Sequence, residues 1–127
     1  MKEVHLICNA HLDPIWQWEW EEGAAAALST FRSAADLADE FDYIFCHNEV
    51  TLYKYIEEYA PALFARIKEL IRIGKWHIMG GWYLQPDCNM PQGEQCHLVS
   101  FCRLCNIPFG HALAPSKTQR TLRIFHR

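Results

Sequence analysis

The feature that most constrains the fold is an alternation of two hydrophobic patterns along the chain. Short continuous apolar runs occupy residues 4–8, 43–46 and 76–79, and each is typical of a buried strand. Between them, residues 23–41 and 49–73 carry apolar side chains at helical spacing. Strands that alternate with helices favour a parallel sheet with helical crossovers. We therefore predict an α/β fold.

Single residues mark where these elements should end. Pro61 should break the second helical segment because proline lacks a backbone donor and clashes with the preceding turn. Asn48 is a suitable N-cap and Gly74 a suitable stop for that segment. Three strands are too few for a closed barrel, since an eight-unit α/β barrel takes ~250 residues. The pattern predicts either a small open sheet or the opening third of a barrel.

The charges divide the chain into two compositional parts. All fifteen acidic residues and all five tryptophans lie at or before Glu94. The remainder, 95–127, carries five Lys and Arg and no acid, which makes it a basic, weakly patterned tail. A nucleic-acid patch is one interpretation of such a tail, but five scattered charges favour a plain chain end. We therefore expect a folded part at 1–94 and no nucleic-acid partner.

Composition excludes several other classes. Half of the residues are apolar and 21% are charged, which is typical of a globular protein. No apolar run approaches the ~20 residues of a membrane helix, and the start lacks a signal-peptide pattern. We therefore expect a cytoplasmic protein without a membrane partner.

The six cysteines raise the questions of disulfides and of structural zinc. Without a secretory signal, disulfides are not expected. Cys102 and Cys105 form a single CxxC, whereas a structural zinc site usually pairs two such half-sites. Cys8 and Cys46 lie in the apolar runs, and we expect both to be buried small hydrophobes.

Polar side chains follow each predicted strand, at the sheet edge where parallel α/β folds bind ligands. His11 and Asp13 are two residues apart, so in extended backbone they face the same side. An imidazole and a carboxylate together suit a divalent metal, usually zinc. The alternative is a histidine that only hydrogen-bonds an aspartate in a turn. Asp87, after the third strand, would be a third ligand, although a loop aspartate beside a proline more often forms a turn.

Two further sets of residues surround these candidates. His47, Asn48 and Glu49 follow the second strand and should converge on the same edge. Trp16 and Trp82 are the tryptophans nearest the metal candidates, so they are the candidate pocket wall. Flat aromatic faces are surfaces on which sugars stack, although tryptophan is also a common core residue.

Two motifs together resemble the N-terminal catalytic region of α-mannosidases of glycoside hydrolase family 38. The motifs are His11-Leu12-Asp13-Pro14-Ile15-Trp16, and Gly74-Lys75-Trp76-His77-Ile78-Met79-Gly80-Gly81-Trp82 continued by Gln85-Pro86-Asp87-Cys88-Asn89-Met90-Pro91-Gln92-Gly93-Glu94. The resemblance runs from Val4 to Glu94. It implies that His11 and Asp13 are ligands of a catalytic zinc ion. It also implies that Asp87 both binds that zinc and acts as the nucleophile, and that Trp16 lies beneath the sugar ring.

The same resemblance implies the fold and the activity. The fold would be the first three strand-helix units of a parallel β/α barrel, left incomplete. The activity would be the retaining hydrolysis of terminal α-D-mannosyl residues in α-mannosides or oligosaccharides. The whole enzyme could be a homo-oligomer.

The chain also departs from the family pattern. The family's fourth zinc ligand and its acid/base carboxylate lie downstream of Asp87, and no acid follows Glu94 here. We therefore expect a truncated fragment that is inactive by itself, with a tail at 95–127 that is read out of frame and has little regular structure after Pro108.

Two other functions compete with this interpretation. One is a metal-dependent carbohydrate deacetylase, which would need further closely spaced histidines after Asp13. The other is a zinc or nucleic-acid binding module built on the Cys/His tail, against which the single CxxC counts.

Overall fold

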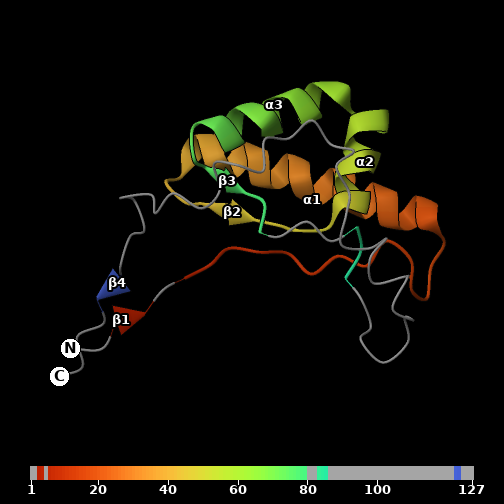
Figure 1. Ribbon diagram of the computed structural model, residues 1–127, viewed down its shortest axis with the longest axis horizontal. Helices are drawn as coiled ribbons and strands as arrows, with labels where there is room; N and C mark the ends of the chain where they lie inside the picture. Colours follow the sequence, from red (N-terminus) through yellow and green to blue (C-terminus); the bar gives the residue numbers. More distant parts are fainter. Residues whose placement is uncertain (1–2, 5, 80–82, 86–121, 124–127) are drawn as a thin grey trace.

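Three helices gather on one side of a short parallel sheet (Figure 1). The structure is a computed structural model and describes residues 3–4, 6–79, 83–85 and 122–123. The elements in chain order are β1 (Glu3–Val4), α1 (Trp20–Glu40), β2 (Phe45–Cys46), α2 (Val50–Tyr59), α3 (Pro61–Arg72), β3 (Trp76–His77) and β4 (Leu122–Arg123).

The sheet that positions the site is built from parallel segments, as the alternation of patterns predicts. β2 and β3 pair in parallel with Phe45 opposite Trp76. On the other side of β2, Cys8 forms an isolated parallel bridge to Phe45, and its carbonyl accepts a hydrogen bond of 2.8 Å from the Cys46 N–H. The chain around Cys8 therefore lies beside β2, and β3 lies on the other side. Closure of these segments into a barrel remains a prediction.

Helix α1 covers the sheet with a face made mostly of alanine. It begins three residues earlier than predicted, at Trp20. Alanine is the strongest helix former, and small side chains let neighbouring elements approach closely. The buried residues of α1 recur at the spacing of one helical face and are Gly23, Ala24, Ala27, Phe31, Ala34, Ala35 and Ala38.

The second helical segment divides where proline predicts it should. α2 ends at Tyr59, and α3 begins with Pro61 at its first position, where a missing N–H costs no hydrogen bond. Gly74 then ends the segment with a φ of 79°, in the left-handed region that favours glycine. The predicted cap at Asn48 is wrong. Glu49 occupies the N-cap position without a side-chain hydrogen bond, and Asn48 instead lines a cavity described below.

Aromatic rings form the centre of the core, between the helices and the sheet. Phe31 of α1 packs edge-on against Phe45 of β2 and Trp76 of β3, with ring centroids 6.2 and 5.2 Å apart. The Trp76 indole N–H donates a 2.8 Å hydrogen bond to the Tyr53 hydroxyl, which itself donates to the His47 carbonyl at 3.1 Å. This relay satisfies the buried polar atoms and fixes the backbone directly after β2.

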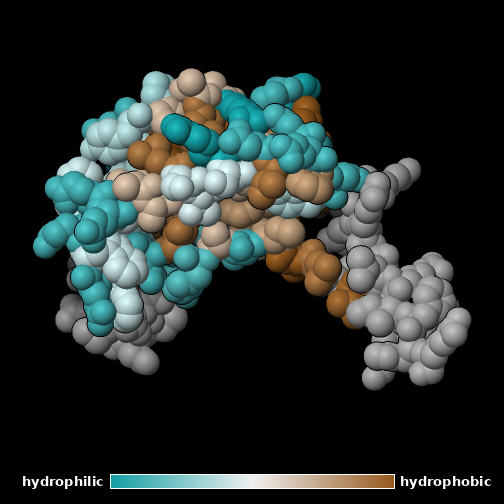
Figure 2. All heavy atoms as spheres, turned by 180° about the vertical axis from the view of Figure 1, so that it is seen from behind, coloured by the Kyte–Doolittle hydropathy of each residue, from teal (hydrophilic) through white to brown (hydrophobic). Residues whose placement is uncertain are grey.

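The first apolar run differs from its prediction as a buried strand. Leu6 and Ile7 are 72% and 67% exposed, and Cys8 is also exposed, whereas Cys46 is buried as expected. Cys8 forms the bridge to β2, whereas Leu6 and Ile7 have no strand partner among the described residues. Figure 2 shows this stretch as hydrophobic surface that leads away from the helices.

The ends of the described chain meet in a second, separate sheet. β1 pairs antiparallel with β4, with Val4 opposite Leu122. β4 lies in the stretch after Pro108, where little regular structure is predicted, and its two residues are the part of that stretch that the structure describes. Residues 95–121 and 124–127 lie outside the described residues, so the structure does not test the expected change of reading frame. None of the helices in the described part of the chain is long and apolar enough to cross a membrane.

Candidate functional site

His11 and Asp13 lie together on the loop between the first parallel segment and α1. The distance from His11 Nε2 to Asp13 Oδ2 is 3.4 Å, and the side chains are 79% and 40% exposed. An imidazole nitrogen and a carboxylate oxygen thus meet at the surface, as their spacing predicts. These are two donors of the type that zinc prefers.

Two contacts hold this loop in place. The Trp18 indole N–H donates a 3.2 Å hydrogen bond to the Asp13 carbonyl. On the other side, Gly23 in the first turn of α1 lies directly against Pro14. A Cβ atom at Gly23 would be 2.0 Å from the Pro14 carbonyl oxygen, so only glycine allows this approach. The loop that carries His11 and Asp13 is therefore positioned by α1.

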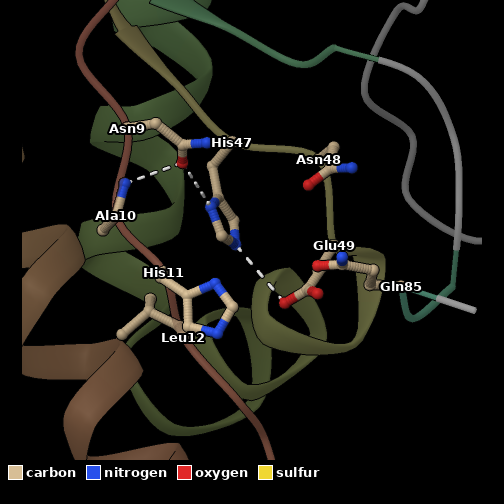
Figure 3. Close-up of a pocket in the computed structure, with 8 residues that line it drawn as sticks. All are labelled: Asn9, Ala10, His11, Leu12, His47, Asn48, Glu49 and Gln85. Carbon is tan, nitrogen blue, oxygen red and sulfur yellow. Dashed lines mark hydrogen bonds and ion pairs between the residues drawn. The ribbon is translucent and has the colours of Figure 1, made fainter. Parts of the chain in front are cut away.

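A cavity of about 280 Å³ opens at the ends of the parallel strands (Figure 3). Its walls come from the chain after Cys8, from the residues after β2 and from Gln85. The lining residues are Asn9, Ala10, His11, Leu12, His47, Asn48, Glu49 and Gln85. The structure thus brings residues that follow all three predicted strands to one cavity, His11 among them.

Of the other predicted site residues, the structure describes Trp16. Trp16 is 66% exposed and packs edge-on against Trp18 at a centroid distance of 5.6 Å, and it does not line the cavity. Asp87 and Trp82 lie outside the described residues. Within the described part of the chain, no three His, Cys, Asp or Glu side chains converge to hold a metal ion. His11 and Asp13 therefore fit as part of a zinc ligand set that needs donors from other residues.

His47 is the most enclosed polar residue of the cavity, with a side chain 3% exposed. Its ring contacts the rings of Phe31 and Tyr53 at centroid distances of 5.2 and 6.2 Å. Burial among these rings disfavours the imidazolium and lowers the pKa of His47 to about 4, although a hydrogen bond to the Ala10 backbone acts in the opposite direction. His47 is therefore neutral at pH 7.

The hydrogen bonds of Asn9 define which nitrogen of His47 carries the proton. Asn9 Oδ1 accepts a 2.7 Å hydrogen bond from the Ala10 N–H, and it lies 3.3 Å from His47 Nδ1. Because this oxygen acts as an acceptor, Nδ1 is the nitrogen that donates. His47 Nε2 is left with a lone pair that faces the Glu49 carboxylate (Figure 3).

Glu49 faces His47 across the cavity wall. The distance from His47 Nε2 to Glu49 Oε2 is 3.8 Å, and both side chains are almost fully buried. Burial raises the pKa of Glu49, while a hydrogen bond from the Gln85 backbone lowers it and the nearby Asp13 carboxylate raises it further. Neither His47 Nε2 nor Glu49 Oε2 has a hydrogen-bond partner among the described residues.

Sequence reasoning placed His47 and Glu49 at the correct sheet edge but assigned them no role. The signal was present, because three polar residues directly follow an apolar strand. What the sequence could not supply was their burial, which depends on aromatic side chains from α1 and α2.

A site at the carboxyl ends of parallel strands, beneath helical crossovers, is typical of α/β enzymes. Comparison with known proteins identifies the family of enzymes. Residues 1–99 match the family model described as the glycosyl hydrolases family 38 N-terminal domain. The chain therefore belongs to glycoside hydrolase family 38.

The similar curated proteins are α-mannosidases. Alpha-mannosidase 2C1 of Mus musculus is 26% identical over 92 residues, which are 72% of this chain and 9% of that protein. Alpha-mannosidase G of Dictyostelium discoideum is 27% identical over 92 residues, 72% of this chain and 8% of its own length. Alpha-mannosidase of Saccharomyces cerevisiae is 27% identical over 96 residues, 74% of this chain and 9% of its own length.

These matches confirm the resemblance seen in the motifs. They favour the glycoside hydrolase class over a carbohydrate deacetylase. The chain spans about a tenth of the length of the relatives it matches.

Proposed function

We propose that this chain is the zinc-binding N-terminal part of a retaining α-mannosidase, an enzyme that hydrolyses terminal α-D-mannosyl residues. The observation that carries the proposal is the family match over 1–99 together with the His11–Asp13 pair at the strand ends. The α-mannosidase names of the similar proteins support the same substrate class.

The proposed metal ligands are His11, Asp13 and Asp87, with a further ligand from outside this set. A bound zinc ion would act as a Lewis acid and orient the sugar by its hydroxyl groups. The His11–Asp13 pair supports this role because it presents one nitrogen and one oxygen donor on the same loop.

The proposed nucleophile is the Asp87 carboxylate. It attacks the anomeric carbon, a glycosyl ester forms, and the bond to the leaving oxygen breaks as that oxygen takes a proton from an acid. Water then hydrolyses the ester, so the configuration at the anomeric carbon is retained. In this scheme Trp16 and Trp82 offer ring faces for the sugar, and the exposure of Trp16 leaves its ring accessible for stacking.

Zinc binding tests the proposal directly. We expect the chain to take up one zinc ion in competition with a chromogenic chelator. His11→Asn and Asp13→Asn should each weaken binding by more than the about 10- to 100-fold that the loss of an outer-shell partner causes, because each removes a ligand. The controls are His77→Asn on β3 and Glu57→Gln on α2, which change one histidine and one carboxylate outside the loop.

The controls should bind zinc like the unchanged chain. Equal zinc affinity in the His11 and Asp13 variants would contradict the ligand assignment. Equal loss of zinc in all four variants, with unchanged circular dichroism, would show that binding is not specific to the loop and would contradict it as well.

A further inference from the structure

The cavity at the strand ends contains a pair of hydrogen-bond acceptors that the proposed zinc site does not use. They are His47 Nε2 and Glu49 Oε2, 3.8 Å apart. Both atoms are buried, and both have no hydrogen-bond partner among the described residues. Leaving such atoms unpaired costs about 1–3 kcal/mol each, so the cavity is built to receive donors.

Neighbouring residues determine that His47 Nε2 and Glu49 Oε2 act as hydrogen-bond acceptors. Asn9 holds the proton of His47 on Nδ1, and the Tyr53 hydroxyl holds the His47 backbone. Gln85 lines the same cavity beside the Glu49 carboxylate, and its backbone favours the charged form of that group. His47 Nε2 and Glu49 Oε2 face each other at the wall of the cavity (Figure 3).

The kind of ligand follows from what these atoms accept. One lone pair and one carboxylate oxygen require two hydrogen-bond donors placed close together. A metal ion fits less well, because no third ligand converges with this pair in the described part of the chain. Two neighbouring hydroxyl groups of a sugar each donate one hydrogen and satisfy both atoms without bringing a charge into the cavity.

We propose that His47 Nε2 and Glu49 Oε2 accept hydrogen bonds from two adjacent hydroxyl groups of the bound glycoside. This inference rests on the proposed function, because it takes a glycoside to be the ligand. In this role His47 and Glu49 bind the substrate and recognise the positions of its hydroxyl groups, and they are distinct from the residues that bind zinc.

The test follows the His47 ring nitrogens in the 127-residue chain by long-range proton–nitrogen correlation spectroscopy. Addition of methyl α-D-mannopyranoside should shift the unprotonated Nε2 resonance, because that atom gains a hydrogen bond. The 2-, 3- and 4-deoxy forms of the same glycoside should separate into two groups. Loss of either of the two contacting hydroxyls should abolish the shift, and loss of the remaining one should not.

A variant tests Glu49 separately. Glu49→Gln removes the carboxylate charge but keeps the shape, and we expect it to weaken binding of the glycoside about tenfold. Glu57→Gln is the matched control, since Glu57 is an exposed carboxylate on α2. Circular dichroism melting of both variants verifies that they fold. The experiment with the deoxy glycosides uses the unchanged chain, so it does not depend on the folding of a variant.

Several results would overturn the inference. No shift at saturating glycoside, equal shifts from all three deoxy forms, or unchanged affinity in Glu49→Gln would mean that the pair holds an ordered water only. A shift caused by zinc and not by the glycoside would mean that the pair is a metal site. If zinc binding still depends on His11 and Asp13 in these cases, the proposed function stands and only this inference fails.

Discussion

At the scale of single residues, Gly23 decides how close the metal-candidate loop lies to α1. Alanine in a helix interior normally stabilises by roughly 0.5–1 kcal/mol relative to glycine. At Gly23 the added methyl group would meet the Pro14 carbonyl oxygen at 2.0 Å. We therefore expect Gly23→Ala to lower the free energy of unfolding by about 1–3 kcal/mol, as overpacking does, and to weaken zinc binding through displacement of the loop.

Urea unfolding and the chelator competition measure the two effects. Ser33→Ala, at an exposed position of the same helix, is the control and should change neither quantity by much. A stabilised Gly23→Ala protein would contradict the close contact between α1 and the loop.

His47 predicts a second behaviour at this scale, which is a dependence of stability on pH. Its pKa is about 4 in the folded protein against 6.5 for the free side chain, because burial disfavours the charged ring. As the pH falls, His47 therefore takes up its proton at a higher pH in the unfolded chain than in the folded protein. His47 contributes stability above pH 6.5, and this is lost as the pH falls from 6.5 to 4, by roughly 3 kcal/mol.

Glu49 acts in the opposite direction, because its raised pKa favours the protonated form in the folded state. The measurement therefore uses Glu49→Gln as the background. Urea unfolding between pH 4 and pH 7 should show the loss, and the added change His47→Asn should remove it. A ring titration of His47 near pH 6.5 would refute the buried, neutral histidine.

At the scale of elements, one arginine joins two helices. Arg66 of α3 forms ion pairs with Asp36 and Asp39 of α1, and its guanidinium also donates to the Ala35 carbonyl at 3.1 Å. The partners are 58% and 65% exposed, so solvent screens the attraction. We expect Arg66→Met to lower the free energy of unfolding by about 0.5–1 kcal/mol, with a smaller effect in 1 M salt.

Arg72 provides the comparison, because it pairs with Glu69 within α3 and joins no second helix. Arg72→Met should cost less than Arg66→Met. Equal losses in the two variants, or a loss at Arg66 that salt does not reduce, would show that the charges are not what joins α1 to α3.

Most of the elements were predictable because local chemistry determines them. Pro61 and Gly74 set the ends of α3 through their own backbone restrictions. The His11–Asp13 pair was predictable for the same reason, since its geometry depends on two residues of one loop. The exposure of Leu6 and Ile7 was not, because a run of apolar residues is the same in sequence whether or not a neighbouring strand covers it.

At the scale of the whole molecule, we predict that a polypeptide of these 127 residues does not hydrolyse α-mannosides at a useful rate. A retaining glycosidase needs two carboxylates on either side of the scissile bond. Asp87 is the proposed nucleophile, and no Asp or Glu follows Glu94 to act as the acid/base group. Release of nitrophenol from 4-nitrophenyl α-D-mannopyranoside, with and without added zinc, measures this.

The control is the same assay with zinc removed by a chelator. Turnover that requires zinc and that is lost in Asp87→Asn would show that the acid/base group lies within these residues after all. The chain could then not be a catalytically incomplete part of the enzyme.

The alanine face of α1 has a consequence for the entropy of folding. An alanine side chain has no rotamers to lose when it becomes ordered, whereas a leucine in the same place loses about 0.5–1 kcal/mol of side-chain freedom. Of the buried residues on α1, Phe31 is the one with a large side chain to immobilise. The layer that supports the strand-end loops therefore becomes ordered with almost no loss of side-chain freedom.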